Sequence, residues 1–217
     1  MQIKRIIFTR SGETEWNRLG RWQGWVASPL NAHGRHQVGK LANFLRNIGI
    51  GVIYASDLKR AQDTVAVMTE KIPVPVHYDE RLRERSIGHW QGMTPDELRL
   101  WYPDEFQALL ADMQGYRIPG GESLDDVYAR MKTAFDAIVT ADAAETVAVI
   151  SHTVSIRALL SGLLGEFAYG QRLRNSSATT IRYDETLGRW VLVASDDIEH
   201  LEGLSTMSAA EAGEEAL

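Results

Sequence analysis

Short apolar runs alternate along the chain with segments in which apolar residues recur at helical spacing. Residues 3–8 form a run rich in β-branched side chains, and comparable runs follow at residues 52–54, 74–78 and 146–150. Such runs predict strands, of which the 74–78 run suits a sheet edge because it contains proline. Helices are predicted after Asn31, from residue 58, after Ser123 and from residue 156.

This alternation predicts an α/β fold, a three-layer α/β/α sandwich around a mostly parallel sheet. Residues 179–183 and 190–193 flank a turn and predict a hairpin that adds an antiparallel edge strand. Residues 85–122 interrupt the pattern and predict a small helical cap over one end of the sheet. We expect one domain over residues 1–202, followed by a flexible acidic tail at 203–217, which is rich in Ala, Ser, Gly and Glu.

Composition and charge exclude several classes of function. Asp and Glu total 29 against 23 Lys and Arg, a net charge of −6, so we expect no nucleic-acid partner. The chain lacks cysteine, which excludes disulfides, thiolate zinc sites and cysteine nucleophiles. The first residues do not have the pattern of a signal peptide, and no run approaches the roughly 18 apolar residues of a membrane span. We therefore expect no membrane partner and a cytoplasmic location.

Four chemically useful side chains follow separate predicted strands, namely Arg10, Arg60, Glu84 and His152. In parallel sheets ligands bind at the carboxyl ends of the strands, so these residues are expected to share one crevice. Each alone is also explained as a structural or surface residue, and their common position favours a site. Two guanidiniums and an imidazole suit phosphate oxygens, and a carboxyl group can protonate a leaving oxygen. The set predicts a phosphomonoester site.

Several motifs resemble those of the histidine phosphatase superfamily, which includes the cofactor-dependent phosphoglycerate mutases. Residues 9–17 read TRSGETEWN, and the family signature is Arg-His-Gly-Glu-Thr with an Asn shortly after. Further matches are SDLKRAQDT at 56–64, LRE at 82–84, PGGES at 119–123, SH at 151–152 with IRAL at 156–159, and DIEHL at 197–201. The resemblance covers residues 3–201, and the combination of motifs is highly specific.

The resemblance implies a role for each matching residue. In the family, the histidine of the first motif attacks the phosphoryl group and becomes phosphohistidine. Carried over, the phosphate ligands are Arg10, Arg60 and His152, with a further contact from Asn17, and Glu84 is the proton donor. Gln23 and Gly24 match the loop that borders the substrate.

The sequence departs from the family at two positions. Ser11 occupies the position of the nucleophilic histidine, and a serine hydroxyl is a weak nucleophile without a positioned base. Thr153 follows His152 where the family usually has glycine, which adds a Cβ beside the phosphate. Three explanations compete: a designed change at position 11 that traps substrate, natural loss of catalysis with retained phosphate binding, or altered chemistry that uses His152 or water. Thr153 favours natural divergence, because one designed change does not account for it.

These observations predict a phosphomonoester-binding, phosphatase-like protein whose catalysis is impaired or altered by Ser11, acting as a monomer or a homodimer on a small phosphorylated molecule. A phosphoglycerate mutase-type phosphotransferase is the first alternative. The family's mutases tend to carry a longer insertion than the 35 positions that separate Glu84 from Pro119 here. The second alternative is a non-catalytic regulatory protein that binds a phosphorylated ligand. We expect no cofactor and no metal.

The prediction of a metal-free site is testable with a chelator. The basic side chains already offset the charge of a phosphate dianion, and the predicted strand ends carry no carboxylate cluster suited to Mg²⁺. Any phosphatase activity is therefore expected to survive EDTA in a colorimetric phosphate-release assay. Activity that disappears with EDTA and returns when Mg²⁺ is added would contradict this expectation.

Overall fold

The β-branched run near the start of the chain forms the central strand of a sheet. A computed structural model describes residues 3–141, 144–165 and 172–204. Within these residues, six strands form one sheet in the order β3-β2-β4-β1-β5-β6. Their bounds are β1 (Arg5–Arg10), β2 (Val52–Ala55), β3 (Val76–Tyr78), β4 (Thr146–Ser151), β5 (Ala178–Asp184) and β6 (Arg189–Asp197).

The parallel strands β1, β2, β3 and β4 have their carboxyl ends on the same side of the sheet. β1 and β4 are parallel and pair from Arg5 opposite Thr146 to Arg10 opposite Ser151. β2 is parallel to both β3 and β4, whereas β5 is antiparallel to β1 and to β6. The predicted mostly parallel sheet with an antiparallel addition is therefore confirmed. Because β5 runs against β1, its first residue, Ala178, lies at the same edge, opposite Thr9.

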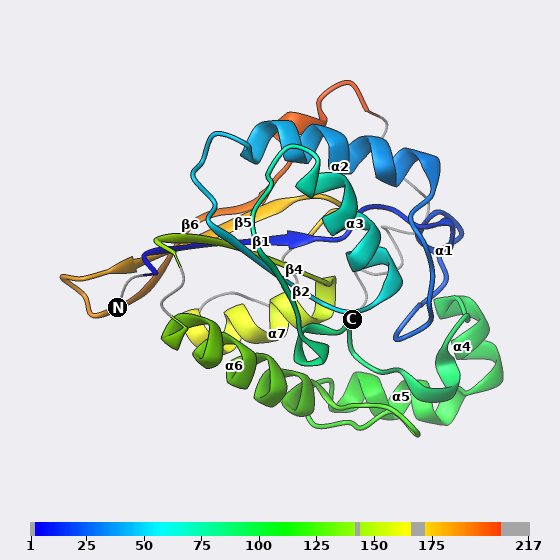
Figure 1. Cartoon of the computed structure of the whole chain (residues 1–217). Coiled ribbons are helices and arrows are strands. Elements are labelled where there is room, and N and C mark those ends of the chain that lie inside the picture. The colour runs from blue at the N-terminus through cyan, green and yellow to red at the C-terminus, as the bar shows by residue number, and fades with distance from the viewer. Residues whose placement is uncertain (1–2, 142–143, 166–171, 205–217) are drawn as a thin grey trace.

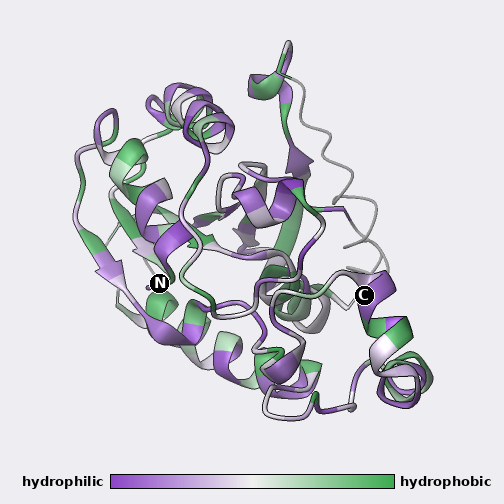
Figure 2. Cartoon of the chain, turned by 90° about the vertical axis from the view of Figure 1, so that its right-hand side faces the viewer, coloured by the Kyte–Doolittle hydropathy of each residue, from purple (hydrophilic) through white to green (hydrophobic). Residues whose placement is uncertain are grey.

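Helices cover both faces of the sheet, which confirms the predicted three-layer architecture (Figure 1). α2 (Ala32–Leu45) and α3 (Lys59–Thr69) pack on one face, and α6 (Leu124–Thr140) and α7 (Thr153–Leu164) pack on the other. Side chains of β1 alternate between the layers: Ile7 packs with α2 and α3, while Ile6 and Phe8 pack with α6 and α7. Figure 2 shows hydrophobic and hydrophilic stretches alternating along the helices, as expected when one side of each helix packs inward.

Local capping signals explain where two long helices begin. The Asn31 side chain accepts a hydrogen bond from the backbone N–H of Gly34 at the start of α2. Ser123 and Asp126 form a capping box at the start of α6, the helix predicted after Ser123, and each side chain accepts from the other residue's backbone N–H. The short α1 (Glu15–Arg18), capped by Thr14, was not predicted from the apolar pattern.

Residues 85–122 contain the 3₁₀ turn η2 (Gly88–Trp90) and the helices α4 (Pro95–Trp101) and α5 (Pro103–Ala111). This helical cap lies at the end of the sheet where α1 is found (Figure 1). It has a buried cluster of its own, which includes Trp90 and Leu98 and also takes in Trp22 from the segment before α2. The cap is therefore packed against the loops that follow β1.

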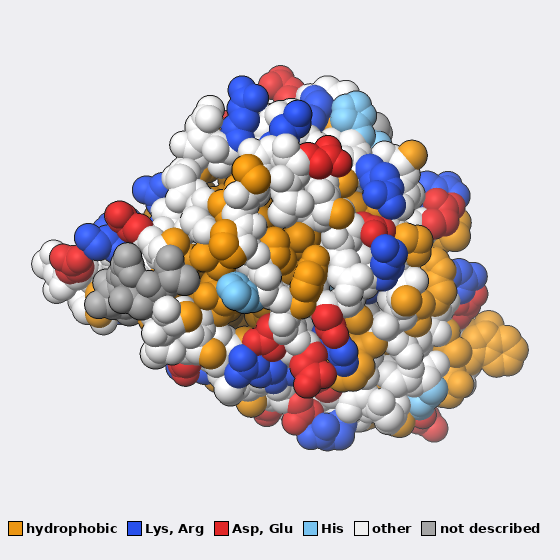
Figure 3. All heavy atoms as spheres, viewed as in Figure 1, with side chains coloured by type: hydrophobic (Ala, Val, Ile, Leu, Met, Phe, Trp, Pro, Cys, Tyr) orange, Lys and Arg blue, Asp and Glu red, His pale blue; other side chains and the backbone are white. Residues whose placement is uncertain are grey.

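Two further 3₁₀ turns complete the described elements, η1 (Glu80–Leu82) and η3 (Glu199–Leu201). Of the predicted tail at 203–217, residues 205–217 lie outside the described residues. None of the described helices is both long enough and apolar enough to cross a membrane. On the face seen in Figure 3, basic and acidic side chains are interspersed.

The capping box of α6 is expected to contribute measurably to stability. Ser123→Ala removes the oxygen that accepts from the Asp126 N–H, and such a loss costs about 1 kcal/mol. Urea unfolding followed by circular dichroism measures this free energy. The exposed Thr133→Ala within the same helix is the control, and its effect is expected to stay within about 0.5 kcal/mol. Equal stability of the Ser123 variant and the parent would contradict the assignment.

Candidate active site

A small cavity at the carboxyl ends of the parallel strands is lined by all nine site residues that the sequence predicts. Its volume is about 40 Å³. The lining residues are Arg10, Ser11, Asn17, Gln23, Gly24, Arg60, Glu84, His152, Thr153 and Asn175. Nine of these ten were predicted; the roles assigned to them by resemblance remain predictions.

Two arginines provide positive charge inside this cavity. Arg10 and Arg60 are both buried. Arg10 Nη1 donates to the Leu173 carbonyl at 2.7 Å, and Arg60 Nη2 donates to the Gly24 carbonyl at 2.9 Å. These carbonyl acceptors help to orient the two guanidiniums. Forked donors of this kind match the oxygens of phosphate.

The His152 ring is buried between Arg60 and Ser56. Arg60 Nε donates to His152 Nδ1 at 3.1 Å. Because arginine only donates, Nδ1 accepts and the ring proton lies on Nε2, which donates to Ser56 Oγ at 2.8 Å. Burial lowers the pKa of His152 well below its usual value, and the positive charges of Arg60, Arg130 and Arg10 lower it further. The imidazole is therefore neutral near pH 7, and both of its nitrogens are engaged.

Glu84 lies at the N-terminus of α7. Its Oε2 accepts from the Val154 N–H at 3.2 Å, and its Oε1 accepts from the N–H groups of Ser155 at 3.2 Å and Arg85 at 2.8 Å. The first N–H of this helix, that of Thr153, finds no acceptor among the described residues. Because Thr153 lines the cavity, its N–H remains available for an anion at the positive end of the helix.

The backbone of Glu84 is held by two donors from distant segments. Arg130 Nη2 and Trp25 Nε1 donate to the Glu84 carbonyl at 2.9 and 2.6 Å. Arg130 also donates to the carbonyls of Arg81 and Arg83, and it pairs with Glu122 at 2.7 Å. Glu122 belongs to the 119–123 motif, so this motif acts on the site by fixing the loop that carries Glu84.

Ser11 lies beside these groups without an activating partner. Its backbone N–H donates to the Ser151 carbonyl at 3.1 Å, which continues the pairing of β1 with β4. No described residue hydrogen-bonds to its hydroxyl. His152, one candidate for a base among the lining residues, already uses both ring nitrogens. The structure thus gives no support to a serine nucleophile activated by His152.

Asn175 is the lining residue that sequence reasoning missed. Its Nδ2 donates to the Ser11 carbonyl at 3.0 Å and to Asn17 Oδ1 at 3.4 Å. The next residue, Ser176, has φ of 58°, and its N–H donates to the Arg10 carbonyl at 3.1 Å. Asn175 precedes β5, and the start of an antiparallel strand lies at the same edge as the ends of the parallel ones. Applying the strand-end rule to that start would have found it.

Asn17, Gln23 and Gly24 reach the cavity through the turn after β1. Asn17 Oδ1 accepts from the Thr14 N–H at 3.1 Å, and Thr14 Oγ1 donates to Gln23 Oε1 at 3.0 Å. Gly24 has φ of +52°, a conformation that favours glycine, and its carbonyl accepts from Arg60. These contacts connect the residues of the turn to the arginine that follows β2.

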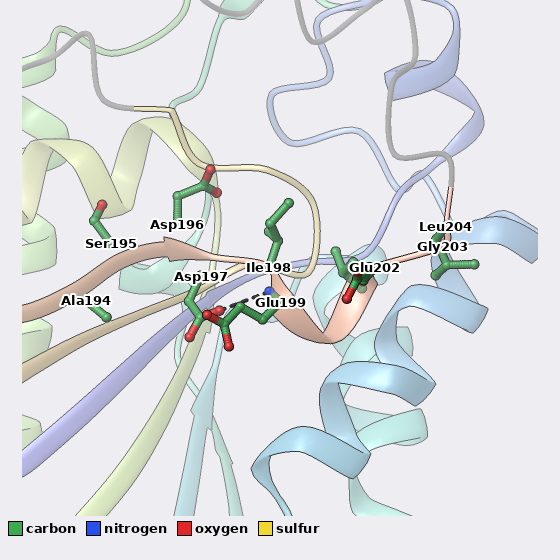
Figure 4. Close-up of a pocket in the computed structure, with 10 residues that line it drawn as sticks. Ala194, Ser195, Asp196, Asp197, Ile198, Glu199, Glu202, Gly203 and Leu204 are labelled. Carbon is green, nitrogen blue, oxygen red and sulfur yellow. Dashed lines mark hydrogen bonds between the residues drawn. The ribbon is translucent and has the colours of Figure 1, made fainter.

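A larger cavity, of about 860 Å³, lies where β6 ends (Figure 4). Its lining runs from Ala194 to Leu204 and includes the acidic residues Asp196, Asp197, Glu199 and Glu202. Basic residues are absent from the described lining, which makes this cavity unsuited to a phosphate despite its size. Within the described part of the chain, no three His, Asp or Glu residues are grouped to hold a metal ion.

A family model and a curated relative each match most of the chain. The model of the histidine phosphatase superfamily (branch 1) matches residues 6–197. A Yersinia pestis protein named "Probable phosphoglycerate mutase GpmB" is 34% identical over 207 residues, which cover 91% of this chain and 95% of that protein.

Two solved structures illustrate the similarity of fold. A mycobacterial glucosyl-3-phosphoglycerate phosphatase in complex with VO₃ is 29% identical, with a TM-score of 0.79, and the match covers 89% of this chain and all of the other. A histidine-to-alanine mutant of phosphoserine phosphatase from Entamoeba histolytica, in complex with phosphoserine, is 26% identical with a TM-score of 0.80. That match covers 91% of this chain and 98% of the other.

The lowered pKa of His152 predicts how anion binding depends on pH. A bound dianion offsets the positive charges of Arg60, Arg130 and Arg10, so it raises the pKa of His152 and binding takes up a proton. Sulfate, whose own charge is constant in this range, is expected to bind more tightly as the pH falls through the pKa that His152 has with the anion bound, by up to about tenfold per pH unit.

Isothermal titration calorimetry at several pH values measures this dependence. His152→Gln is the matched variant, because an uncharged amide oxygen can still accept from Arg60 but cannot take up the proton. We expect its sulfate affinity to vary less with pH. An identical pH dependence in the parent and the variant would contradict the assignment to His152.

Proposed function

The chain belongs to the histidine phosphatase superfamily, and we propose that it binds a phosphomonoester at the cavity of Arg10, Arg60 and His152. In this proposal Ser11 occupies the position of the nucleophilic histidine, and catalysis is impaired or altered as a result. The observation that carries the proposal is a small cavity lined by Arg10, Arg60 and Ser11, in which no described residue hydrogen-bonds to the serine hydroxyl.

Binding is favoured by groups that do not depend on the side chain at position 11. Arg10 and Arg60 are oriented by carbonyls, and the Thr153 N–H lies at the start of α7. These donors attract a phosphate in its ground state. His152 adds a charged donor only when it takes up a proton, which a bound dianion favours. Loss of the imidazole at position 11 is thus expected to leave affinity largely intact.

The covalent step, unlike phosphate binding, lacks the groups that it needs among the described residues. Formation of a phosphoenzyme at Ser11 requires removal of the hydroxyl proton, and no described residue hydrogen-bonds to that hydroxyl. The E. histolytica structure is consistent with a separation of the two roles, since a histidine-to-alanine mutant of that phosphatase holds phosphoserine. Glu84 is the proposed proton donor to the leaving oxygen, and slow attack by water assisted by Glu84 is the residual route.

Thr153 is the second departure within the site. It is buried, lines the cavity and begins α7. The resemblance to the family implies a glycine at this position, so Thr153 adds a Cβ beside the proposed phosphate site. We propose that Ser11 and Thr153 together reflect natural divergence from an active phosphatase, within one domain that spans residues 1–202.

A phosphoglycerate mutase-type transferase is the second candidate. It is favoured by the 34% identity to the Yersinia pestis protein of that name. A mutase retains the phosphoryl group on its nucleophile and returns it to the product, which makes it at least as dependent on the missing imidazole as a phosphatase. The chain with Ser11 is therefore expected to be impaired in either reaction.

Restoring the imidazole tests the proposal. Ser11→His is expected to raise the turnover of p-nitrophenyl phosphate by about 10³–10⁶-fold, because loss of a nucleophile typically costs that much while affinity changes little. The parent chain is expected to bind inorganic phosphate in calorimetry and to release little nitrophenol.

The control combines Ser11→His with Arg60→Ala, which should abolish the gain because the phosphate is no longer held. A small gain from Ser11→His alone would point to Thr153, and Ser11→His with Thr153→Gly then separates the two departures. Rapid turnover by the parent chain would refute impaired catalysis. Failure of the parent to bind phosphate would refute the proposed site.

A further inference from the structure

A second small cavity adjoins the phosphate cavity. It measures about 50 Å³ and shares four lining residues with the first, Gln23, Gly24, Glu84 and Thr153. The shared residues form the boundary between the two spaces. A phosphomonoester seated with its phosphate in the first cavity therefore has its ester oxygen near this boundary and its organic part directed to the second.

The walls that belong to the second cavity alone are mainly apolar. Trp22 and Ile87 line it from the turn after β1 and from the start of the cap, and Val154 lines it from α7. Trp22 and Ile87 are also members of the buried cap cluster, where the rings of Trp22 and Trp90 are 6.1 Å apart. Because the cap core packs behind these two side chains, the apolar wall is rigid and preformed.

The charged lining residues disfavour a negatively charged organic group. Arg85, the cation of this lining, is buried and donates through Nε to the Glu122 carbonyl and through Nη2 to the Tyr116 carbonyl, both at 2.9 Å. Both acceptors are carbonyls of the 85–122 segment, so these bonds hold the guanidinium against that segment. The other charged residue is Glu84, whose carboxyl oxygens accept from the backbone N–H groups of Arg85, Val154 and Ser155, so it supplies no positive charge to pair with a carboxylate.

We propose that the second cavity is a leaving-group site for a small, uncharged, apolar group, so that the ligand class is an aryl or short alkyl phosphate and not a phosphorylated carboxylic acid. Trp22, Ile87 and Val154 are its specificity-determining residues. This inference rests on the proposed phosphate site. It separates this chain from relatives that are named for acting on phosphoserine or glucosyl-3-phosphoglycerate.

Equilibrium binding of four probes to the full chain tests the inference. Calorimetry compares inorganic phosphate, phenyl phosphate, glycerol 1-phosphate and 3-phosphoglycerate, with the slow-turnover Ser11 chain used as it stands. Phenyl phosphate is expected to bind about tenfold or more tightly than each of the other three, because part of the ring is removed from water.

Val154→Asn keeps a similar side-chain volume and makes the wall polar, so the ratio of the inorganic phosphate Kd to the phenyl phosphate Kd is expected to fall toward one. Val193→Asn is the matched control on β6, at a position that is 59% exposed and belongs to neither lining, and it should leave the ratio unchanged.

If phosphate binds and phenyl phosphate binds no more tightly than glycerol 1-phosphate, the leaving-group inference is overturned and the phosphate site stands. If phosphate itself does not bind, the proposed function fails, and the inference fails with it.

Discussion

The hydrogen bond from Arg60 to His152 is the contact on which the site depends. It joins the helix that follows β2 to the end of β4, across 92 residues of sequence. It fixes the tautomer of His152, and the neighbouring positive charge keeps that ring neutral while it is buried. It also holds one end of a guanidinium whose other end donates to the Gly24 carbonyl. Arg60 thus links the end of β4 to the turn after β1.

The parts of the fold that could be predicted are those with local causes. The β-branched run at β1, the Asn31 cap and the Ser123–Asp126 box act within a few residues, so the sequence shows them directly. Arg10, Arg60, Glu84 and His152 were found because strand ends in a parallel sheet share one edge, and the other five site residues came from the resemblance to the family. Asn175 was missed because the strand-end rule was applied only to the ends of the parallel strands and not to the start of the antiparallel β5, which Asn175 precedes. Arg130 was missed because its bonds to three carbonyls become visible only when α6 packs beside the 81–84 loop.

Binding and chemistry are held by different parts of this site. The arginines and the first N–H of α7 are oriented by backbone contacts that do not involve the side chain of Ser11. A nucleophile, in contrast, acts only through its own side chain and a base that contacts it. In the proposed function, serine at the position of the family's nucleophile removes the reaction path, while the groups proposed to attract phosphate remain. A serine is also smaller than a histidine, so in that proposal the exchange adds room in the cavity.

Buried guanidiniums also constrain what the folded chain can tolerate. Removing a charge from water costs several kcal/mol unless a partner compensates it, and carbonyl acceptors compensate only part of that cost. Arg10 and Arg60 are both buried, and burial, followed by the positive charges of Arg60, Arg130 and Arg10, lowers the pKa of His152. The same positive charges attract an anion that enters the cavity. That attraction does not require turnover, so it serves an enzyme and a protein that only binds its ligand equally.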